Sequence, residues 1–461
     1  MEAVDLRHNL LTGFEQHPDI IPWRSVLYLD LGFNRLQGSI PIPPPSINVY
    51  QVNDSFLSGE IPPSIICHNS SLQIFDLSVN NFSGTIPECL SSFSDSLLAL
   101  NLSHNNFHGT IPHMMGINLK VIDLSQNHLH GLVPRSLQNC TLLEILVLGN
   151  NQMEGTFPSW LGALPMLKVL ILRSNRFHGA IIVSQAKLKF AKLHIIDLSD
   201  NGFSGNLPSE YFENWNAMTM IEREHLTYLQ DEVKGITINL GSVDIIFPTL
   251  HCMYSITMDN KGTKRLYQKI QKAFTAIDLS NNKFGGEIPE SLGRLNGLHM
   301  LKLSNNNLTG VIPSSLANLT ELESLDLSQN LLSGEIPQQL SQLTFLEFLN
   351  VSHNHLTGRI PRRNQFDTFE NNSYDGNSGL CGYPLSKLCP PPPSLSFHGD
   401  DSKFPSGVVD WIIILLGYGS GLIVGLVIGH TLTTRYHEWF VEKFGTRKQT
   451  QRRVQRKRRR I

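Results

Sequence analysis

Apolar and polar residues follow one recurring order along most of the chain, illustrated by LDLSQNLLSGEIP at residues 325–337. The shared phrase is L-x-L-x-x-N-x-L-x-G-x-I-P. Its first two leucines flank a polar residue, here Asp326, which predicts a short strand that buries the leucines on one side. Asn330 follows the strand, where its amide can hydrogen-bond backbone groups that would otherwise be buried and unpaired. Gly334 permits the chain to turn, and Pro337 limits the structure that can follow.

The asparagine of this phrase marks thirteen repeats, one of which carries serine instead. The positions are Asn9, Asn34, Ser55, Asn80, Asn105, Asn127, Asn151, Asn175, Asn201, Asn282, Asn306, Asn330 and Asn354. They lie 21 to 26 residues apart, except for one step of 81 between Asn201 and Asn282. A period of this length is the signature of a leucine-rich-repeat solenoid, in which stacked copies share one core. We therefore expect an α/β solenoid in the shape of a horseshoe or superhelix, whose long concave face binds a partner. We do not expect the protein to be an enzyme.

Charge is unevenly distributed, although the formal net charge is only −2. From Arg435 onward eleven Lys and Arg oppose two Asp and Glu, a balance of +9, so residues 1–434 carry −11. Between these parts lies WIIILLGYGSGLIVGLVIG, residues 411–429, which has no charged residue. As a helix it is about 28 Å long, close to the ~30 Å hydrocarbon core of a bilayer. Basic residues gather on the cytoplasmic side, which predicts a single-pass protein with an extracellular solenoid and a cytoplasmic tail.

Glycosylation sequons agree with a secretory route. They are Asn53, Asn69, Asn81, Asn101, Asn139, Asn307, Asn318, Asn350 and Asn371. By contrast, residues 1–10 already follow the repeat, with neither a signal peptide nor an N-terminal cap. We therefore expect the sequence to be a fragment or an incomplete gene model.

Cysteine positions indicate a stabilised solenoid end. Cys381 and Cys389 lie eight residues apart just after the last repeat, and we expect them to form a disulfide in a C-terminal cap. Cys67 and Cys89 lie in neighbouring repeats and can pair, but the connectivity of these two with Cys140 and Cys252 stays open.

The row of repeat asparagines, which we call the ladder, is interrupted once, and the chain divides into seven parts. They are repeats 1–9 over residues 1–208, a non-repeat island over 209–272, repeats 10–13 over 273–361, a cap over 362–389, a Pro-rich and acidic spacer over 390–408, a membrane helix over 409–432, and a basic tail over 433–461.

This order, together with specific stretches, resembles the plant leucine-rich-repeat receptor-like proteins, kinase-lacking receptors of the disease-resistance type. The matching stretches are YSIT at 254–257 with KG at 261–262, GLCG at 379–382 and GYGSG at 417–421, whereas residues 235–250 depart from the family's pattern. The L-x-G-x-I-P ending is similar to the plant-specific repeat class, which adds a second short strand. The resemblance implies a plasma-membrane receptor in plant defence that binds an extracellular peptide, protein or glycan. It also implies signalling through adaptor and co-receptor kinases, which contact the membrane helix and the second repeat block.

Within the solenoid, repeats 6–9 and the island form the longest stretch without a sequon on the expected concave face. There Val147, Ile171 and Arg173 replace the usual Asp and Ser at outward positions, with Gln152 and Arg176 beside them. Exposed apolar groups flanked by arginine suit a ligand anchor, so these five residues are the predicted binding patch. The alternative is that they are structural members of the repeat.

In the membrane helix, Gly417, Gly421, Gly425 and Gly429 recur every fourth residue, which predicts a face that packs closely on a partner helix. The basic tail is expected to fix topology and to contact anionic lipid rather than nucleic acid. No motif for a cofactor, a metal or catalysis is found in the sequence. Two other functions remain open: a developmental peptide-receptor subunit, and an extracellular enzyme inhibitor similar to polygalacturonase-inhibiting proteins.

Overall fold

The structure is a computed structural model that describes residues 2–13, 21, 23–63, 71–89, 96–113, 117–182, 190–221, 227–229, 236–239, 244–247, 255–390 and 406–435. The chain divides into two units, Met1–Pro390 and Pro391–Ile461. The first unit contains the repeats and the island, and the second contains the apolar helix.

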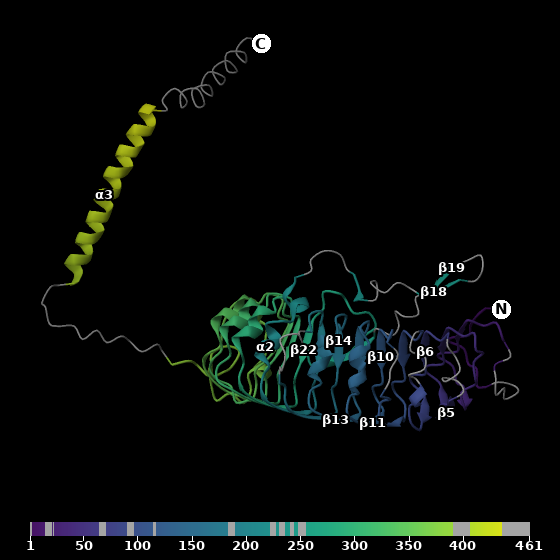
Figure 1. The fold of residues 1–461 in the computed structure, drawn as a ribbon. Coiled ribbons are helices and arrows are strands. Elements are labelled where there is room, and N and C mark those ends of the chain that lie inside the picture. The colour runs from purple at the N-terminus through teal and green to yellow at the C-terminus, as the bar shows by residue number, and fades with distance from the viewer. Residues whose placement is uncertain are drawn as a thin grey trace, which may run out of the picture. The chain divides into compact units, whose positions relative to one another are not determined.

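In the first unit, the L-x-L segments form one parallel sheet of thirteen strands along the solenoid (Figure 1). In sheet order these are β1 (Ala3–Asp5), β2 (Tyr28–Asp30), β4 (Val49–Gln51), β6 (Ile74–Asp76), β8 (Ala99–Asn101), β10 (Val121–Asp123), β12 (Ile145–Val147), β14 (Val169–Ile171), β16 (Ile195–Asp197), β22 (Ala276–Asp278), β24 (Met300–Lys302), β26 (Ser324–Asp326) and β28 (Phe348–Asn350). We call this the main sheet and its side away from the leucine core the outer face. The predicted leucine-rich-repeat solenoid is confirmed.

The L-x-G-x-I-P part of repeats 2–13 supplies a second strand, and the cap adds one more. These strands form parallel sheets of their own: β3 (Gln37–Gly38), β5 (Phe56–Glu60) and β7 (Asn81–Ser83); β9 (His108–Gly109), β11 (His128–Gly131), β13 (Gln152–Gly155), β15 (Arg176–Ala180), β17 (Gly202–Asn206), β23 (Lys283–Glu287) and β25 (Asn307–Thr309); and β27 (Ser333–Glu335), β29 (His355–Arg359) and β30 (Gly379–Cys381). The glycine is needed here: Gly334 has φ +75°, and a Cβ on it would meet Val311 Cγ1 of the preceding repeat at 3.0 Å.

After the proline, many repeats form a short 3₁₀ helix that returns the chain to the next strand. These helices are Arg135–Asn139, Ser159–Ala163, Glu290–Arg294, Ser314–Asn318 and Gln338–Gln342, with Asn364–Asp367 and Asn371–Ser373 in the cap. Each of the five places a leucine, such as Leu316, in the apolar core. One continuous apolar core therefore runs through all the repeats.

From Asn34 onward, each asparagine of the ladder links its repeat to an earlier one. Asn330, which is buried, donates through Nδ2 to the carbonyls of Leu303 at 3.0 Å, Leu327 at 3.2 Å and Ser328 at 3.1 Å. Its Oδ1 accepts from the Leu308 N–H at 3.0 Å. The expected role of the asparagine is confirmed, because its amide satisfies backbone groups of two successive repeats.

The same hydrogen-bond pattern continues into the cap, at a position that the sequence analysis did not assign to the ladder. Asn377 donates to the carbonyls of Val351 and Tyr374, both at 2.9 Å, and accepts from the Leu356 N–H at 3.0 Å. Strand β30 then pairs with β29, and its Cys381 forms the expected disulfide with Cys389. The cap is thus built as one more, degenerate turn of the solenoid.

The island interrupts the sequence but not the main sheet. Strand β16 pairs directly with β22, with Asp197 opposite Asp278, and Phe203 N–H donates to Asn282 Oδ1 at 3.0 Å across the insertion. The described parts of the island are helix α2 (Ser209–Phe212), a 3₁₀ turn (Asn216–Thr219) and two antiparallel hairpins, β18 (Ile236–Asn239) with β19 (Asp244–Phe247), and β20 (Ile256–Asn260) with β21 (Thr263–Tyr267).

In the second unit, the apolar segment forms helix α3 (Ser406–Arg435), as expected. Within it, Leu415–Leu432 is long and apolar enough to cross a membrane, by length and composition. The four glycines at every fourth position lie in this span, and a Cβ built on each would meet open space within the chain.

Candidate ligand-binding site

The β20–β21 hairpin of the island folds back over the outer face of the main sheet. Near its start, Arg173 Nη1 donates to the Thr257 carbonyl at 2.8 Å. At its turn, Lys261 Nζ lies 2.7 Å from Glu323 Oε2 and 2.6 Å from Glu347 Oε2. Arg173 follows β14, whereas the two glutamates precede β26 and β28, so the hairpin is fixed to both repeat blocks.

Apolar packing holds the base of the hairpin. Ile256 and Met258 belong to one buried cluster with Val147, Ile171 and Ile195 from the outer face of the main sheet. Alternation along β20 explains this, since residues two apart point to the same side of a strand. The hairpin therefore covers part of the first repeat block with an apolar contact rather than through charges alone.

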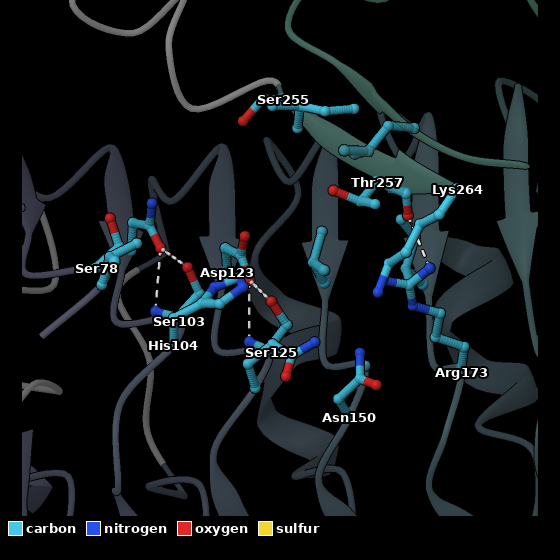
Figure 2. A pocket seen from close by; sticks show the side chains of 18 residues that line it. Ser78, Ser103, His104, Asp123, Ser125, Asn150, Arg173, Ser255, Thr257 and Lys264 are labelled. Carbon is cyan, nitrogen blue, oxygen red and sulfur yellow. Dashed lines mark hydrogen bonds between the residues drawn. The ribbon is translucent and has the colours of Figure 1, made fainter. Parts of the chain in front are cut away.

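A cavity of about 270 Å³ remains between the hairpin and the main sheet, and we call it the hollow (Figure 2). Its floor carries hydroxyl, amide and carboxylate groups from the repeats, and the hairpin closes it from above. The floor residues include Ser78, Asn101, Ser103, His104, Asp123, Ser125 and Asn150, and the hairpin side includes Ser255, Ile256, Thr257, Lys264 and Leu266. The hollow thus combines polar groups with an apolar wall formed by Val147 and Ile171.

Among the described residues that line the hollow, the charged side chains are Arg173, Lys264 and one carboxylate, Asp123. Arg173 Nε is buried and has no hydrogen-bond partner in the part of the chain that the structure describes. Asp123 accepts from the Ser125 N–H at 2.9 Å and from its hydroxyl at 2.6 Å. Burial raises the pKa of Asp123 above its usual range. Arg173 therefore keeps one unpaired N–H beside the hollow, while the aspartate is held by its own turn.

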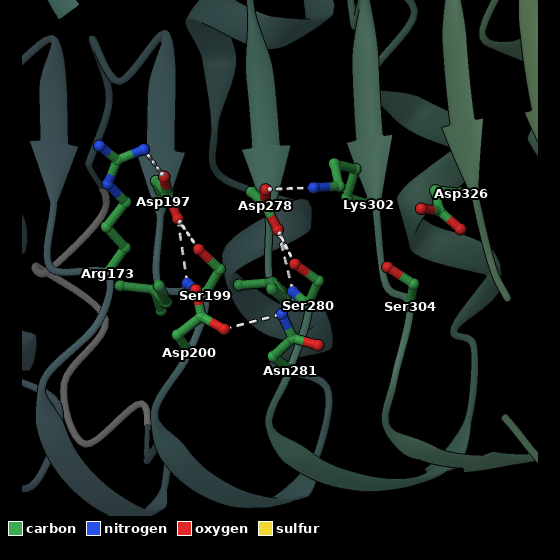
Figure 3. Close-up of polar contacts among 12 residues, drawn as sticks. Arg173, Asp197, Ser199, Asp200, Asp278, Ser280, Asn281, Lys302, Ser304 and Asp326 are labelled. Atoms are coloured by element: carbon green, nitrogen blue, oxygen red, sulfur yellow. Dashed lines mark hydrogen bonds and ion pairs between the residues drawn. The ribbon is translucent and has the colours of Figure 1, made fainter. Parts of the chain in front are cut away.

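Arg173 also belongs to a second row of charges, at the junction of the two repeat blocks (Figure 3). It lies 3.9 Å from Asp197 of β16, and Lys302 of β24 lies 3.2 Å from Asp278 of β22, the strand between them. Burial, and secondly the neighbouring Asp278, raise the pKa of Asp197 to about 7. Two cations therefore flank two adjacent carboxylates, and one of these cations also holds the hairpin.

The structure divides the predicted binding patch. Val147, Ile171 and Arg173 do line one cavity, but the first two are not exposed anchors: they are 8% and 2% exposed, because the apolar cluster of the hairpin packs on them. That part of the prediction is wrong. Gln152 and Arg176 begin β13 and β15 of the second sheet, where Arg176 Nη2 donates to Gln152 Oε1 at 3.1 Å, and neither lines the hollow.

Sequence reasoning missed the hairpin side of the hollow. Ser255, Lys264 and Leu266 carry no repeat signal, and only the YSIT and KG stretches drew attention to their neighbours. Among the sequons, Asn101 lines the hollow and its Oδ1 accepts from the Ser103 hydroxyl at 2.7 Å. Asn81 and Asn307 instead begin strands of the second sheets. Asn69, Cys67 and Cys252 lie outside the described residues, while Cys89 is disulfide-bonded and Cys140 is a buried thiol.

Comparisons with known proteins agree with this architecture. Models of the leucine-rich-repeat family match residues 117–177 and 296–356, and 71–93, 96–116, 192–214 and 274–295. Receptor like protein 27 of Arabidopsis thaliana is 42% identical over 97% of this chain and 54% of its own length. Receptor-like protein 12 of the same plant is 50% identical over 58% of this chain and 30% of its own length. The chain therefore spans about half, or less, of the length of these relatives.

Solved structures with the same fold include two plant receptors. The peptide hormone receptor RGFR1 in complex with RGF2 has a TM-score of 0.56 and 25% identity, over 78% of this chain and 52% of that one. The ectodomain of the Arabidopsis receptor kinase HAESA, bound to an IDA peptide hormone ligand, has a TM-score of 0.52 and 27% identity, over 85% of this chain and 64% of that one.

Proposed function

We propose that this chain, which belongs to the leucine-rich-repeat receptor-like proteins, is the ligand-binding part of a cell-surface receptor. In this proposal the solenoid faces the outside of the cell, α3 crosses the plasma membrane once, and the basic tail lies in the cytosol. The relatives that are similar over most of the chain are receptor-like proteins, which supports a binding function rather than an enzymatic one.

The ligand we propose is an extended peptide that occupies the hollow. The hollow itself is the observation that carries the proposal, because it places an unpaired arginine donor beside hydroxyl and amide groups and an apolar wall. Backbone carbonyls of a peptide suit the first set, and an apolar side chain suits the second. The two structural neighbours described above bind peptide hormones, which supports the same ligand class.

A peptide display library screened against the full chain in lipid nanodiscs tests this proposal. Peptides that it enriches are expected to bind at least tenfold more weakly to Leu266→Asp, because that side chain lines the hollow and is 60% exposed. Leu132→Asp is the matched control, since Leu132 is 67% exposed but does not line the hollow. Enriched peptides that bind both variants equally would refute the hollow as the site.

We further propose that the receptor signals through a partner kinase, by contact with the helix face that contains Gly417, Gly421, Gly425 and Gly429. Small residues in one row let two helix backbones approach closely in lipid. Gly421→Leu with Gly425→Leu is expected to reduce co-purification of the kinase, while Ile423→Leu, on the opposite face of the helix, leaves it intact. Equal recovery with both variants would contradict this interface.

The biological role we propose is defence. The disease-resistance resemblance supports this choice, and the test is transcript abundance. Induction of the transcript by a microbial elicitor supports the proposal, whereas expression confined to meristems favours a developmental receptor.

A further inference from the structure

The residue just before each ladder position has a left-handed backbone, with φ between +51° and +57°. Asparagine, aspartate and histidine are enriched in this conformation, whereas a bulky or β-branched residue is an outlier in it. Phe33 and Val79 are the two apolar residues of the row, and each is 43% exposed, so little burial offsets their conformational cost. The row consists of His8, Phe33, Asp54, Val79, His104, Gln126, Asn150, Ser174, Asp200, Asn281, Asn305, Gln329 and His353.

The two outliers lie on either side of the third repeat, because β2, β4 and β6 are neighbours in the main sheet. The Phe33 N–H donates to the Asn53 carbonyl at 2.9 Å, and the Ser55 N–H donates to the Val79 carbonyl at 3.1 Å. The sequon formed by Asn53, Asp54 and Ser55 is therefore directly bordered by an exposed apolar residue on each side.

The sequon exists because the ladder lapses in this repeat. Ser55 takes the place of the ladder asparagine, and its hydroxyl is buried without a hydrogen-bond partner among the described residues. At the equivalent position of the next repeat, Asn80 donates to the Val52 carbonyl at 2.7 Å and accepts from the Leu57 N–H at 3.1 Å. The serine therefore gives up the ladder bonds, but it supplies the third residue of an N-x-S sequon, which an asparagine would not.

The surroundings of Asn53 suit a sugar. A Cβ on Gly32 would collide with Asn53 Oδ1, so the glycine of the preceding repeat leaves room for this side chain, which makes no hydrogen bond within the described part of the chain. The Phe33 ring stacks on His8 of the first repeat, with 4.4 Å between the ring centroids and 15° between the planes. Its opposite face is therefore turned toward the third repeat, where the C–H groups of a pyranose ring can pack on it.

We propose that Asn53 carries an N-linked glycan whose first N-acetylglucosamine packs on the open face of Phe33, with Val79 at the other border of this seat. An oligosaccharyltransferase breaks the bond between the anomeric carbon of the sugar and a lipid pyrophosphate, joins that carbon to Asn53 Nδ2 and releases one amide proton. The proposal rests on the extracellular position of the solenoid proposed above, because the modification belongs to secreted surfaces. Since Val79 also lines the hollow, the glycan would limit how far a ligand extends toward the first repeats.

Site-by-site glycopeptide mass spectrometry of the full chain, purified from plant cell membranes, tests the modification. We expect a glycan at Asn53, with the exposed sequon Asn318 as the internal reference. Ser55→Asn, which restores the ladder but destroys the sequon, should remove this glycan, whereas Ser55→Thr should keep it. A chain with glycans elsewhere but none at Asn53 would overturn this proposal alone. A chain with no glycan at any sequon would also overturn the extracellular position of the solenoid.

The seat is tested by the rate at which a peptide N-glycanase releases the glycan from the folded chain. Phe33→Asn removes the ring at a position that tolerates asparagine, so release from Asn53 should become about fivefold faster relative to Asn318, which is the scale of one aromatic contact. Phe33→Tyr keeps a ring and should release the glycan at the native rate. Gln329→Asn is the matched control, because Gln329 has the same left-handed position in the second repeat block. Equal release rates in the native and Phe33→Asn chains would overturn the seat.

A peptide is the alternative occupant of this surface. If the peptides selected for the hollow bind at least tenfold more weakly to Phe33→Asn, and Asn53 carries no glycan, the surface belongs to the ligand site and the glycan proposal is refuted. Peptides that depend on Leu266 but not on Phe33 would agree with a glycan at the edge of the hollow.

Discussion

Replacing Arg173 with alanine is expected to release the base of the β20–β21 hairpin. Arg173 is 14% exposed and donates a charge-assisted hydrogen bond of 2.8 Å to the Thr257 carbonyl. Hydrogen bonds to charged groups contribute about 1.5–3 kcal/mol. Since RT is about 0.6 kcal/mol, loss of this bond corresponds to roughly a 10- to 150-fold larger open population of the hairpin base.

Amide hydrogen exchange measured by mass spectrometry reports this change. Peptides that cover β20 and β21 should exchange faster by a factor in that range, while peptides from β26 and β28 keep their rates. Arg176→Ala is the matched control, because Arg176 is exposed and donates only to Gln152 at the surface. Such surface contacts contribute little to stability, so the hairpin amides should keep their protection from hydrogen exchange in this variant. Equal exchange in the two variants would show that Arg173 does not hold the hairpin.

Three other changes test the frame around the site. Asn330→Ala should lower the free energy of unfolding by about 2–5 kcal/mol, because it leaves at least two buried backbone groups unpaired. The control, Asn9→Ala at an exposed position, should lower it by under about 1 kcal/mol. Equal losses of the two variants in chemical denaturation would contradict the role of the asparagines. Lys261→Gln should raise exchange only at the hairpin turn, by up to about fivefold, because its two glutamate contacts are partly exposed. The unfolding temperature should fall as pH rises from about 4 through 7. The reason is that the folded state raises the pKa of Asp197 to about 7, well above its unfolded value of 3.8, and so favours the protonated carboxyl. Asp197→Asn should flatten that pH dependence.

The repeat architecture could be predicted because its signal is local and is repeated. Each strand, each asparagine and each turn glycine acts within one repeat or on the next, so a fixed period contains the necessary information. Asn377 was not predicted as a ladder position, because it lies outside that local pattern. The residues before it, Ser373, Tyr374 and Asp375, lack the L-x-L strand pattern, although its amide makes the same three kinds of bond as Asn330.

The candidate site could not be predicted to the same degree, because it depends on contacts between distant segments. Val147 and Ile171 break the polar pattern of the outer face, and the sequence analysis interpreted them as an exposed anchor. Their apolar character instead matches Ile256 of the hairpin, which is more than 80 residues away from either in the chain. No local pattern shows which repeats a returning segment will cover. The sequence therefore revealed the unusual apolar residues of the outer face but not the hairpin that packs on them.

The junction of the two blocks explains how the island can be inserted without breaking the solenoid. Asp197 and Asp278 come side by side only because β16 pairs with β22, and adjacent buried carboxylates repel one another. Arg173 and Lys302 offset that repulsion from either side of the pair. Because Arg173 also donates to Thr257, one side chain both compensates the junction and holds the hairpin over the hollow. A ligand carboxylate drawn toward its unpaired Nε would compete with Asp197 for the same positive charge. If the hollow binds the ligand as proposed, that binding, the position of the hairpin and the protonation of the junction would be linked through Arg173.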